Sequence, residues 1–216
     1  MKYLTIPVVA LCLSGSVNFE SSARTPLIQQ EMQQEDQNDE HAHIAKYKDL
    51  VKRENKNLLL KTTNGKDVVL KNTDNPEDAE NYATYFFEDY LKSIDAYLVM
   101  IQYYEGEEYC LISKKTGEQT IVPGQILLSP DKKRFISYNM DLEAGYSPNG
   151  FAIYLIKDNT FENEYELYSE EWGPSKVKWI NNNEIEIERT VWSDNELIKD
   201  GNARCLFENS EWICEE

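Results

Sequence analysis

Oxygen-bearing side chains gather in one connection, DLEAGYSPNG, which runs from residue 141 to residue 150. Asp141, Glu143 and Asn149 offer carboxylate and amide oxygens close together in the chain. Ca²⁺ takes about six to eight oxygen ligands from such side chains and from loop carbonyls. The connection therefore predicts a Ca²⁺ site, with a solvated acidic loop as the alternative.

A second group of carboxylates, Glu105, Glu107 and Glu108, lies at an expected turn. Most glycosidases use two carboxylates that flank the scissile bond. Because the chain has 39 acidic residues, such pairs also arise by chance. These residues support a carbohydrate-active protein as an alternative function, and they identify no catalytic residue.

Both histidines, His41 and His43, precede the expected folded domain, which begins at residue 57. A domain without imidazole argues strongly against a Ser-His-Asp or Cys-His hydrolase and against a His-ligated zinc site. The sequence also lacks a glycine-rich phosphate loop and a dinucleotide-binding fingerprint. We therefore predict a non-enzymatic binding protein, such as an inhibitor, an immunity factor or an envelope assembly module.

Five aromatic residues are expected near strand ends or in loops. They are Tyr103, Tyr104, Tyr146, Trp172 and Trp192. Exposed aromatic rings at such positions predict a binding face. The alternative is that these rings belong to the core.

The cysteines predict one disulfide bond. Cys205 and Cys214 flank a short segment with Asn209-Ser210 at its centre. With these two residues as a turn, the cysteines face each other as a non-hydrogen-bonded pair on neighbouring strands, a spacing that suits a disulfide. Cys110 is then unpaired, and we expect it to be buried in its own strand.

The first sixteen residues, MKYLTIPVVALCLSGS, have the pattern of a secretory signal peptide. A lysine precedes an apolar run that is too short to span a bilayer, and small residues follow the run. We expect cleavage after Ser16; cleavage after Ala23 and acylation of Cys12 are the alternatives. The mature protein is expected to be periplasmic or secreted, in a bacterium, without insertion into the membrane.

The net charge of the chain is −17. Such an excess repels phosphate groups and anionic membrane surfaces, which argues against a nucleic-acid partner. It favours a cationic partner, and we expect that partner to be another protein. A solvated acidic surface that keeps an exported protein soluble is the alternative.

Residues 17–56 are expected to form a flexible acidic arm. The stretch QQEMQQEDQNDE is almost free of apolar residues and cannot offset the entropy lost on ordering. A short helix is expected at 42–53, where Ile44, Tyr47 and Val51 share one helical face.

Three strands are expected in AYLVMIQYYEGEEYCLISKKTGEQTIV, at residues 96–104, 108–113 and 118–122. A hairpin is expected before them at 57–70, because Asn64-Gly65 is a strong signal for a two-residue turn. This hairpin matches the second half of the three-strand segment in character, position by position, which indicates a repeat.

The segment before residue 96 is ambiguous. Residues 82–90 alternate as a strand does, yet the apolar positions of 79–91 also fit a helix. We predict a helical turn at 76–80 and a strand at 82–90, with a longer helix as the alternative.

The same order of strands recurs twice more along the chain. The later strands are expected at 126–129, 134–140, 150–157, 164–169, 177–180, 184–192, 203–207 and 211–214. Units of four strands repeating every roughly 40–50 residues are typical of propeller blades. The predicted fold is therefore mainly β, with repeated antiparallel meanders over residues 57–216.

The passage LLSPDKKRFI, with its SPD-K motif at residues 129–133, resembles the repeat of TolB-type propellers and other WD40-like proteins. A degenerate copy, WINNNEI, lies at residues 179–185. This resemblance covers residues 57–214 and implies propeller-like blades. It implies no function, because one fold serves many functions. Since three or four units are few for a closed ring, an open or partial array is the alternative.

Overall fold

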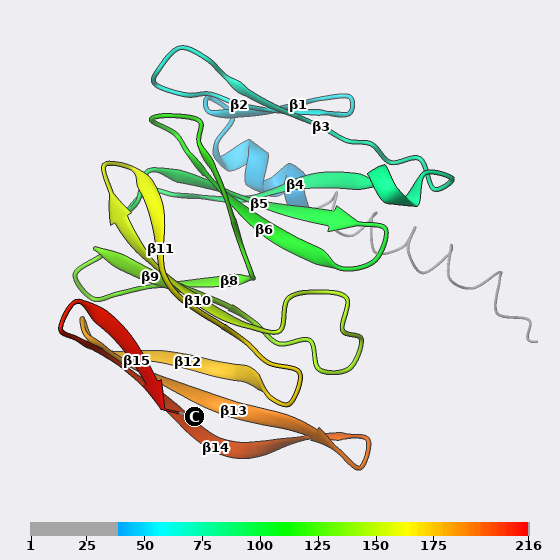
Figure 1. Cartoon of the computed structure of the whole chain (residues 1–216). Helices are drawn as coiled ribbons and strands as arrows, with labels where there is room; N and C mark the ends of the chain where they lie inside the picture. The colour runs from blue at the N-terminus through cyan, green and yellow to red at the C-terminus, as the bar shows by residue number, and fades with distance from the viewer. Residues whose placement is uncertain (1–38, 216) are drawn as a thin grey trace, which may run out of the picture. The chain divides into compact units, whose positions relative to one another are not determined.

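The computed structural model describes residues 39–215, and the fold is mainly β, as predicted. Four antiparallel sheets follow one another along the chain (Figure 1). The predicted signal peptide, and the predicted arm as far as residue 38, lie outside the described residues. Within the described range, no helix has the length and apolar character needed to cross a membrane.

Each sheet is a meander of consecutive strands. The first contains β1 (Val51–Glu54), β2 (Asn57–Leu60) and β3 (Val68–Lys71). The second contains β4 (Ala83–Leu91), β5 (Ala96–Tyr103), β6 (Glu107–Ser113) and β7 (Gln119–Val122). The third contains β8 (Gln125–Leu128), β9 (Arg134–Asn139), β10 (Gly150–Lys157) and β11 (Thr160–Tyr168). The fourth contains β12 (Gly173–Asn181), β13 (Glu184–Ser193), β14 (Glu196–Glu208) and β15 (Glu211–Glu215).

The ambiguous segment before β5 is a strand, as predicted, and a short 3-10 helix at Ala79–Asn81 precedes it. The hairpin predicted at 57–70 is confirmed, since β2 pairs with β3 in antiparallel fashion. Its turn is not the expected two-residue turn at Asn64-Gly65, because the longer connection 61–67 joins the two strands. In that connection Gly65 takes a positive φ of 81°, and the Asn64 side chain instead donates to the carbonyl of Thr116 in the second sheet at 2.7 Å.

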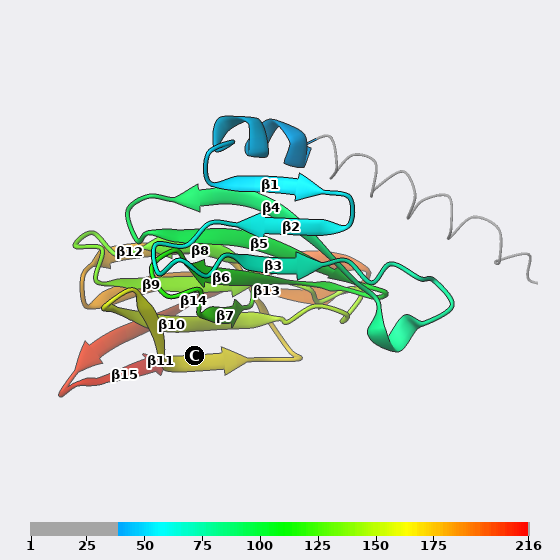
Figure 2. The ribbon, with the colours of Figure 1, turned by 90° about the horizontal axis from the view of Figure 1, so that it is seen from above.

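The helix predicted at 42–53 is present but ends early. Residues 39–46 are helical, whereas residues from Val51 pair with β2 as strand β1. Glu40 of the helix accepts a hydrogen bond from the backbone N–H of Phe87 at 2.8 Å and forms an ion pair with Arg53. Figure 2 shows the helix beside β1 and β4, where it covers strand edges that would otherwise be open to another chain.

The sheets pack face to face, which explains the continuous apolar runs of the sequence. In β5, Tyr97 packs toward the first sheet, while Leu98 packs toward the third. In β10, Ile153 packs toward the fourth sheet and Tyr154 toward the second. A strand that is covered on both faces is apolar at successive positions instead of alternating.

Three apolar clusters lie between successive sheets. Within residues 39–215 no such cluster joins the first sheet to the fourth, and closure into a propeller ring is not shown. The outer face of the fourth sheet carries a row of alternating charge made by Lys178, Glu186 and Arg204. A charged outer face ends an array of stacked units, because another unit packed there would bury those charges.

One polar aromatic side chain in each later sheet donates a hydrogen bond to a carbonyl of the sheet before it. The pairs are Tyr97 Oη to Lys61 O at 2.5 Å, Tyr154 Oη to Ile121 O at 3.3 Å, and Trp179 Nε1 to Leu127 O at 3.0 Å. These bonds let large aromatic rings fill the space between the sheets without leaving their polar atoms unpaired.

Candidate functional site

The connections between strands alternate between two ends of the array, because neighbouring strands run in opposite directions (Figure 1). We call one set the acidic end. It comprises residues 55–56, 72–82, 104–106, 123–124, 140–149, 169–172 and 194–195. The opposite set, the lysine end, comprises residues 61–67, 92–95, 114–118, 129–133, 158–159, 182–183 and 209–210.

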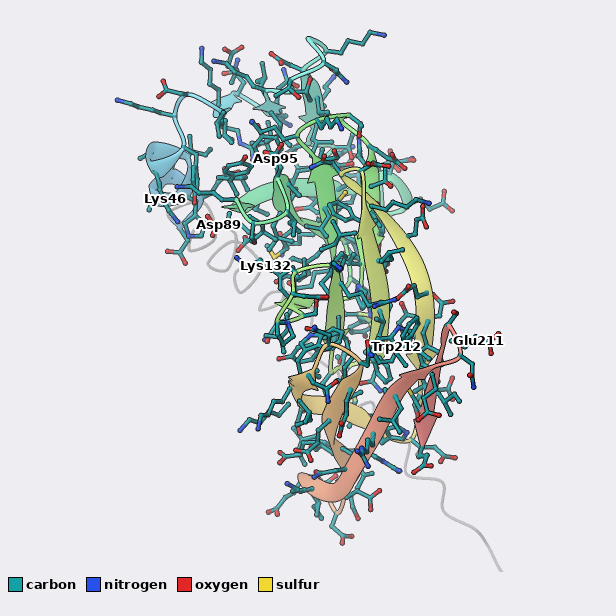
Figure 3. The ribbon with its side chains drawn as sticks, turned by 90° about the vertical axis from the view of Figure 1, so that its left-hand side faces the viewer. Lys46, Asp89, Asp95, Lys132, Glu211 and Trp212 are labelled. Carbon is teal, nitrogen blue, oxygen red and sulfur yellow. A yellow bond between two sulfur atoms is a disulfide. The ribbon has the colours of Figure 1, made fainter. Side chains whose placement is uncertain are left out.

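Charge is distributed very unevenly between these two ends. The acidic end holds ten acidic residues and one lysine: Asp74, Glu77, Asp78, Glu80, Glu105, Asp141, Glu143, Glu170, Glu171 and Asp194, with Lys56. The lysine end holds seven lysines and five acidic residues: Lys61, Lys66, Lys92, Lys114, Lys115, Lys132 and Lys133, with Asp67, Asp95, Glu118, Asp131 and Asp158. Figure 3 views the protein from the lysine end, with Asp95 and Lys132 labelled. The acidic end therefore carries a large excess of negative charge, whereas the lysine end carries a small excess of positive charge.

A polar cleft of about 720 Å³ opens at the acidic end. Its walls are Glu108, Asp141, Leu142, Gly145, Ser147, Pro148, Asn149, Tyr168, Ser169 and Glu170. These residues come from the start of β6, the connection 140–149 and the segment that follows β11. The cleft thus unites parts of the second and third sheets that are far apart in the sequence.

The carboxylate of Asp141 organises the connection 140–149 of the acidic end. Oδ1 accepts hydrogen bonds from the backbone N–H groups of Ala144 at 3.1 Å and Gly145 at 3.0 Å. Oδ2 accepts from the N–H groups of Tyr146 and Ser147, each at 2.8 Å. Partial burial opposes ionisation of this carboxyl, but the four bonds outweigh it and hold the pKa of Asp141 below its usual value.

Contacts with the segments 169–172 and 104–106 also hold the connection 140–149 in place. The side chain of Asn149 donates to the carbonyls of Ser169 at 2.6 Å and Trp172 at 3.0 Å. On the other side, a Cβ placed on Gly106 would lie 2.3 Å from the carbonyl oxygen of Tyr146, so only glycine permits this close approach. One wall of the cleft is therefore held in place at both of its ends.

Two of the three predicted Ca²⁺ ligands, Asp141 and Asn149, have other hydrogen-bond partners in this arrangement. Both carboxylate oxygens of Asp141 accept backbone N–H groups, and Oδ1 of Asn149 accepts the N–H of Asp141 at 3.1 Å. Across residues 39–215, no group of three or more His, Cys, Asp or Glu side chains is placed to hold a metal ion. Ca²⁺ binding by Asp141, Glu143 and Asn149 stays a prediction, since the hydrogen bonds of the connection account for its shape.

Two other carboxylates, Glu108 and Glu170, line the cleft. Glu170 is exposed, and Glu108 accepts a hydrogen bond from the hydroxyl of Tyr103 at 2.9 Å. Burial and the bond to Glu108 raise the pKa of Tyr103 to about 12, so the phenol remains a donor at neutral pH. Burial and the nearby charges of Glu166 and Glu108 raise the pKa of Tyr168 in the same way. The cleft therefore combines negative charge with neutral phenol rings.

The predicted aromatic residues separate into three groups. Tyr104 and Tyr146 are exposed at the acidic end, at 41% and 61%, and Tyr103 is half-buried beside them. Trp172 is only 2% exposed and belongs to the core, so its ring offers no surface to a partner. Trp192 is 38% exposed at the end of β13.

The cleft also contains a residue that the sequence did not indicate. Tyr168 is 50% exposed at the end of β11 and lines the cleft directly. Its strand has an alternating pattern that places one face outward, but only the packing of the neighbouring connection turns this position into a cleft wall.

Comparison with protein-family models gives no match, and comparison with curated proteins gives no match either. Function must therefore be argued from the geometry and charge of the acidic end itself.

Proposed function

We propose that this protein is an exported, non-enzymatic binding protein, and that its acidic end receives a cationic segment of another protein. The observation that carries the proposal is the coincidence, at one end of the array, of ten acidic residues, exposed tyrosines and a cleft of about 720 Å³. An inhibitor, an immunity factor and an envelope assembly module are the classes of protein that bind in this way.

A cationic partner fits the cleft for two reasons. Carboxylates gathered around a concave surface focus a negative potential and attract positive charge from a distance. Tyrosine rings such as Tyr168 and Tyr146 add a short-range attraction, because a guanidinium or ammonium group is stabilised over the face of an aromatic ring. Arginine suits both contacts, since it pairs with a carboxylate through two hydrogen bonds and also stacks on a ring.

Export is supported by the disulfide bond between Cys205 and Cys214, because such bonds persist in oxidising compartments. The stacked four-stranded meanders support an array of propeller-like blades, left open at both ends. Such a scaffold presents loops from several sheets on one end, which suits the recognition of another protein.

The test uses an arginine-rich synthetic peptide and isothermal titration calorimetry at low and high salt. Glu108→Gln combined with Glu170→Gln should weaken binding roughly tenfold, because two charge-assisted contacts are lost. The matched control is Glu118→Gln with Asp158→Asn, which removes the same charge at the lysine end and should change little. If both double variants weaken binding equally, only the net charge matters and the cleft is not the site.

A carbohydrate-binding function is the second candidate. Tyr146 and Tyr168 expose large parts of their rings beside a polar cleft, as residues that stack on sugar rings do. A screen against neutral oligosaccharides distinguishes the two functions. Binding or turnover of a neutral glycan that is insensitive to salt would favour this candidate over a cationic protein partner.

A further inference from the structure

The hairpin between β13 and β14 extends beyond its sheet. Strand β12 pairs with β13 only as far as Thr190, and β15 pairs with β14 only from Arg204 onward. Residues 191–198 therefore pair only with each other, as a two-stranded ribbon. We call this ribbon the finger; it turns at Asp194-Asn195, where both residues have positive φ, and it lies at the acidic end (Figure 1). The sequence had placed the start of β14 at residue 203, so most of this strand was missed.

The finger exposes apolar side chains in the middle of acidic surroundings. Trp192 and Leu197 face each other across the ribbon and are 38% and 49% exposed, and Ile198 is 44% exposed. A cross-strand pair of this kind stabilises the ribbon, but it does not require a ribbon that projects beyond the sheet. Apolar side chains clustered on a projecting element of a very acidic protein indicate a contact surface.

The base of the finger is fixed relative to the cleft. A register shift between Glu188 and Thr190 bends the hairpin where the finger begins. At this bend the guanidinium of Arg189 lies 4.9 Å from the ring centre of Trp172 and pairs with Asp200 at 3.1 Å. The carbonyl of Trp172 in turn accepts a hydrogen bond from Asn149, in the wall of the cleft. A contiguous series of contacts thus connects the finger to the cleft.

We propose that the finger is a second contact element for the same partner, and that this partner is a cationic amphipathic segment. Its apolar side chains pack on Trp192 and Leu197, which share one face of the finger, while its positive groups face the carboxylates of the acidic end. The proposal rests on the proposed function and narrows the partner from any cationic segment to one with an apolar face. Charge complementarity selects a peptide segment over an anionic membrane, which the acidic end would repel.

The fluorescence of Trp192 provides a measurement of peptide binding at the finger. The chain has four tryptophans, and Trp172, Trp179 and Trp212 are buried at 2%, 8% and 5% exposure. The probe is a Lys/Leu peptide of about 18 residues, or five helical turns, with every leucine on one helical face. Binding should shift the tryptophan emission to shorter wavelength and reduce its quenching by acrylamide, and Trp192→Phe should remove that shift. A scrambled peptide of the same composition should bind at least several-fold more weakly.

The affinity of finger variants for the Lys/Leu peptide provides an independent measurement. Trp192→Thr with Leu197→Thr keeps strand-forming residues in the ribbon and should weaken binding of the Lys/Leu peptide about tenfold. Ile213→Thr is the matched control, since Ile213 is 52% exposed on β15 of the same sheet and lies outside the finger. Equal melting temperatures of the variants would establish that the fold is intact.

Two outcomes overturn the proposal, and they are distinguishable. If the Lys/Leu peptide binds and is sensitive to Glu108→Gln with Glu170→Gln, but neither the tryptophan emission nor the double threonine variant changes, the finger is not a contact element and the proposed function stands. If neither this peptide nor the arginine-rich peptide binds, the finger and the proposed function both fail.

Discussion

Single side chains decide the shape of the acidic end. Asp141 gathers four backbone N–H groups into one carboxylate, and Asn149 connects the same loop to the fourth sheet through the carbonyl of Trp172. A loop of this length has few backbone hydrogen bonds of its own. The charged carboxylate of Asp141 therefore accepts the N–H groups that a neighbouring strand would accept in a sheet. The wall of the cleft therefore depends on the ionised state of one carboxyl.

Replacement of Asp141 by Asn tests this dependence. Asparagine keeps one acceptor oxygen but turns an NH₂ group toward two N–H donors, so the free energy of unfolding should fall by about 1–2 kcal/mol at pH 7. Because the folded-state pKa of Asp141 is lowered from 3.8, its contribution is complete well above that value and is lost as the pH falls through the lowered pKa. Urea unfolding of both proteins at pH 7 and at pH 3 should show a difference that shrinks in acid; an unchanged difference would contradict the role of the charge.

At the scale of the element, the last hairpin is closed by a covalent bond. Asn209-Ser210 forms the predicted two-residue turn, Cys205 lies opposite Cys214, and their sulfurs are bonded as predicted. Cys110 is buried and unpaired, as expected, and burial raises the pKa of its thiol to about 11. A thiol with this pKa exchanges poorly with disulfides near neutral pH.

Loss of the Cys205–Cys214 bond should lower the free energy of unfolding by roughly 2–3 kcal/mol, because the crosslink restricts the unfolded chain. The measurement is urea unfolding with and without a reductant, and the double variant Cys205→Ala with Cys214→Ala should be insensitive to the reductant. Peptide mapping under non-reducing conditions should recover the 205–214 crosslink, whereas a crosslinked peptide containing Cys110 would refute the pairing.

The hydrogen bonds that tyrosine hydroxyls donate from one sheet to the preceding sheet provide a second prediction. Tyr97→Phe and Tyr154→Phe each remove one hydroxyl and with it a hydrogen bond between two sheets, so each should cost about 1 kcal/mol. The two bonds lie between different pairs of sheets, so the effects should add within about 0.5 kcal/mol in the double variant. Tyr146→Phe is the matched control, because that hydroxyl belongs to a largely exposed ring and its loss should be neutral.

On the scale of the whole molecule, the array has two kinds of sheet. Within residues 39–215, the second and third sheets have apolar clusters on both faces, whereas the first and fourth have one on a single face. The first sheet is also the smallest, with three strands of four residues each. Stability should therefore be highest in the middle of the array and lower toward its ends.

Native-state hydrogen exchange measures this gradient. Amides of β5, β6, β9 and β10 should exchange slowest, those of β13 and β14 faster, and those of β1 to β3 fastest. The physical reason is that opening an end sheet exposes one apolar interface, while opening a middle sheet exposes two. Equal protection of β3 and β5 would instead indicate that the first sheet is covered on its outer face as well.

Local sequence patterns were enough to predict the elements that depend on neighbours in the chain. Continuous apolar runs marked the strands that are covered on both faces, such as β5 and β10, and the spacing around Asn209-Ser210 was enough to pair the two cysteines. Strand periodicity and turn chemistry are local properties, so they can be read without knowing the rest of the fold.

The place where the acidic residues meet depends on how the sheets pack, and local sequence patterns do not predict it. Glu108 lies at the start of β6, and Asp141 and Glu170 lie in two different connections. They share a cleft because antiparallel strands return alternate connections to the same end. The packing of the sheets also decided that Tyr168 lines the cleft while Trp172 is buried, although the two are close in the chain. Exposure depends on which sheet packs against a residue, and that is set by contacts between segments distant in the sequence, which periodicity does not record.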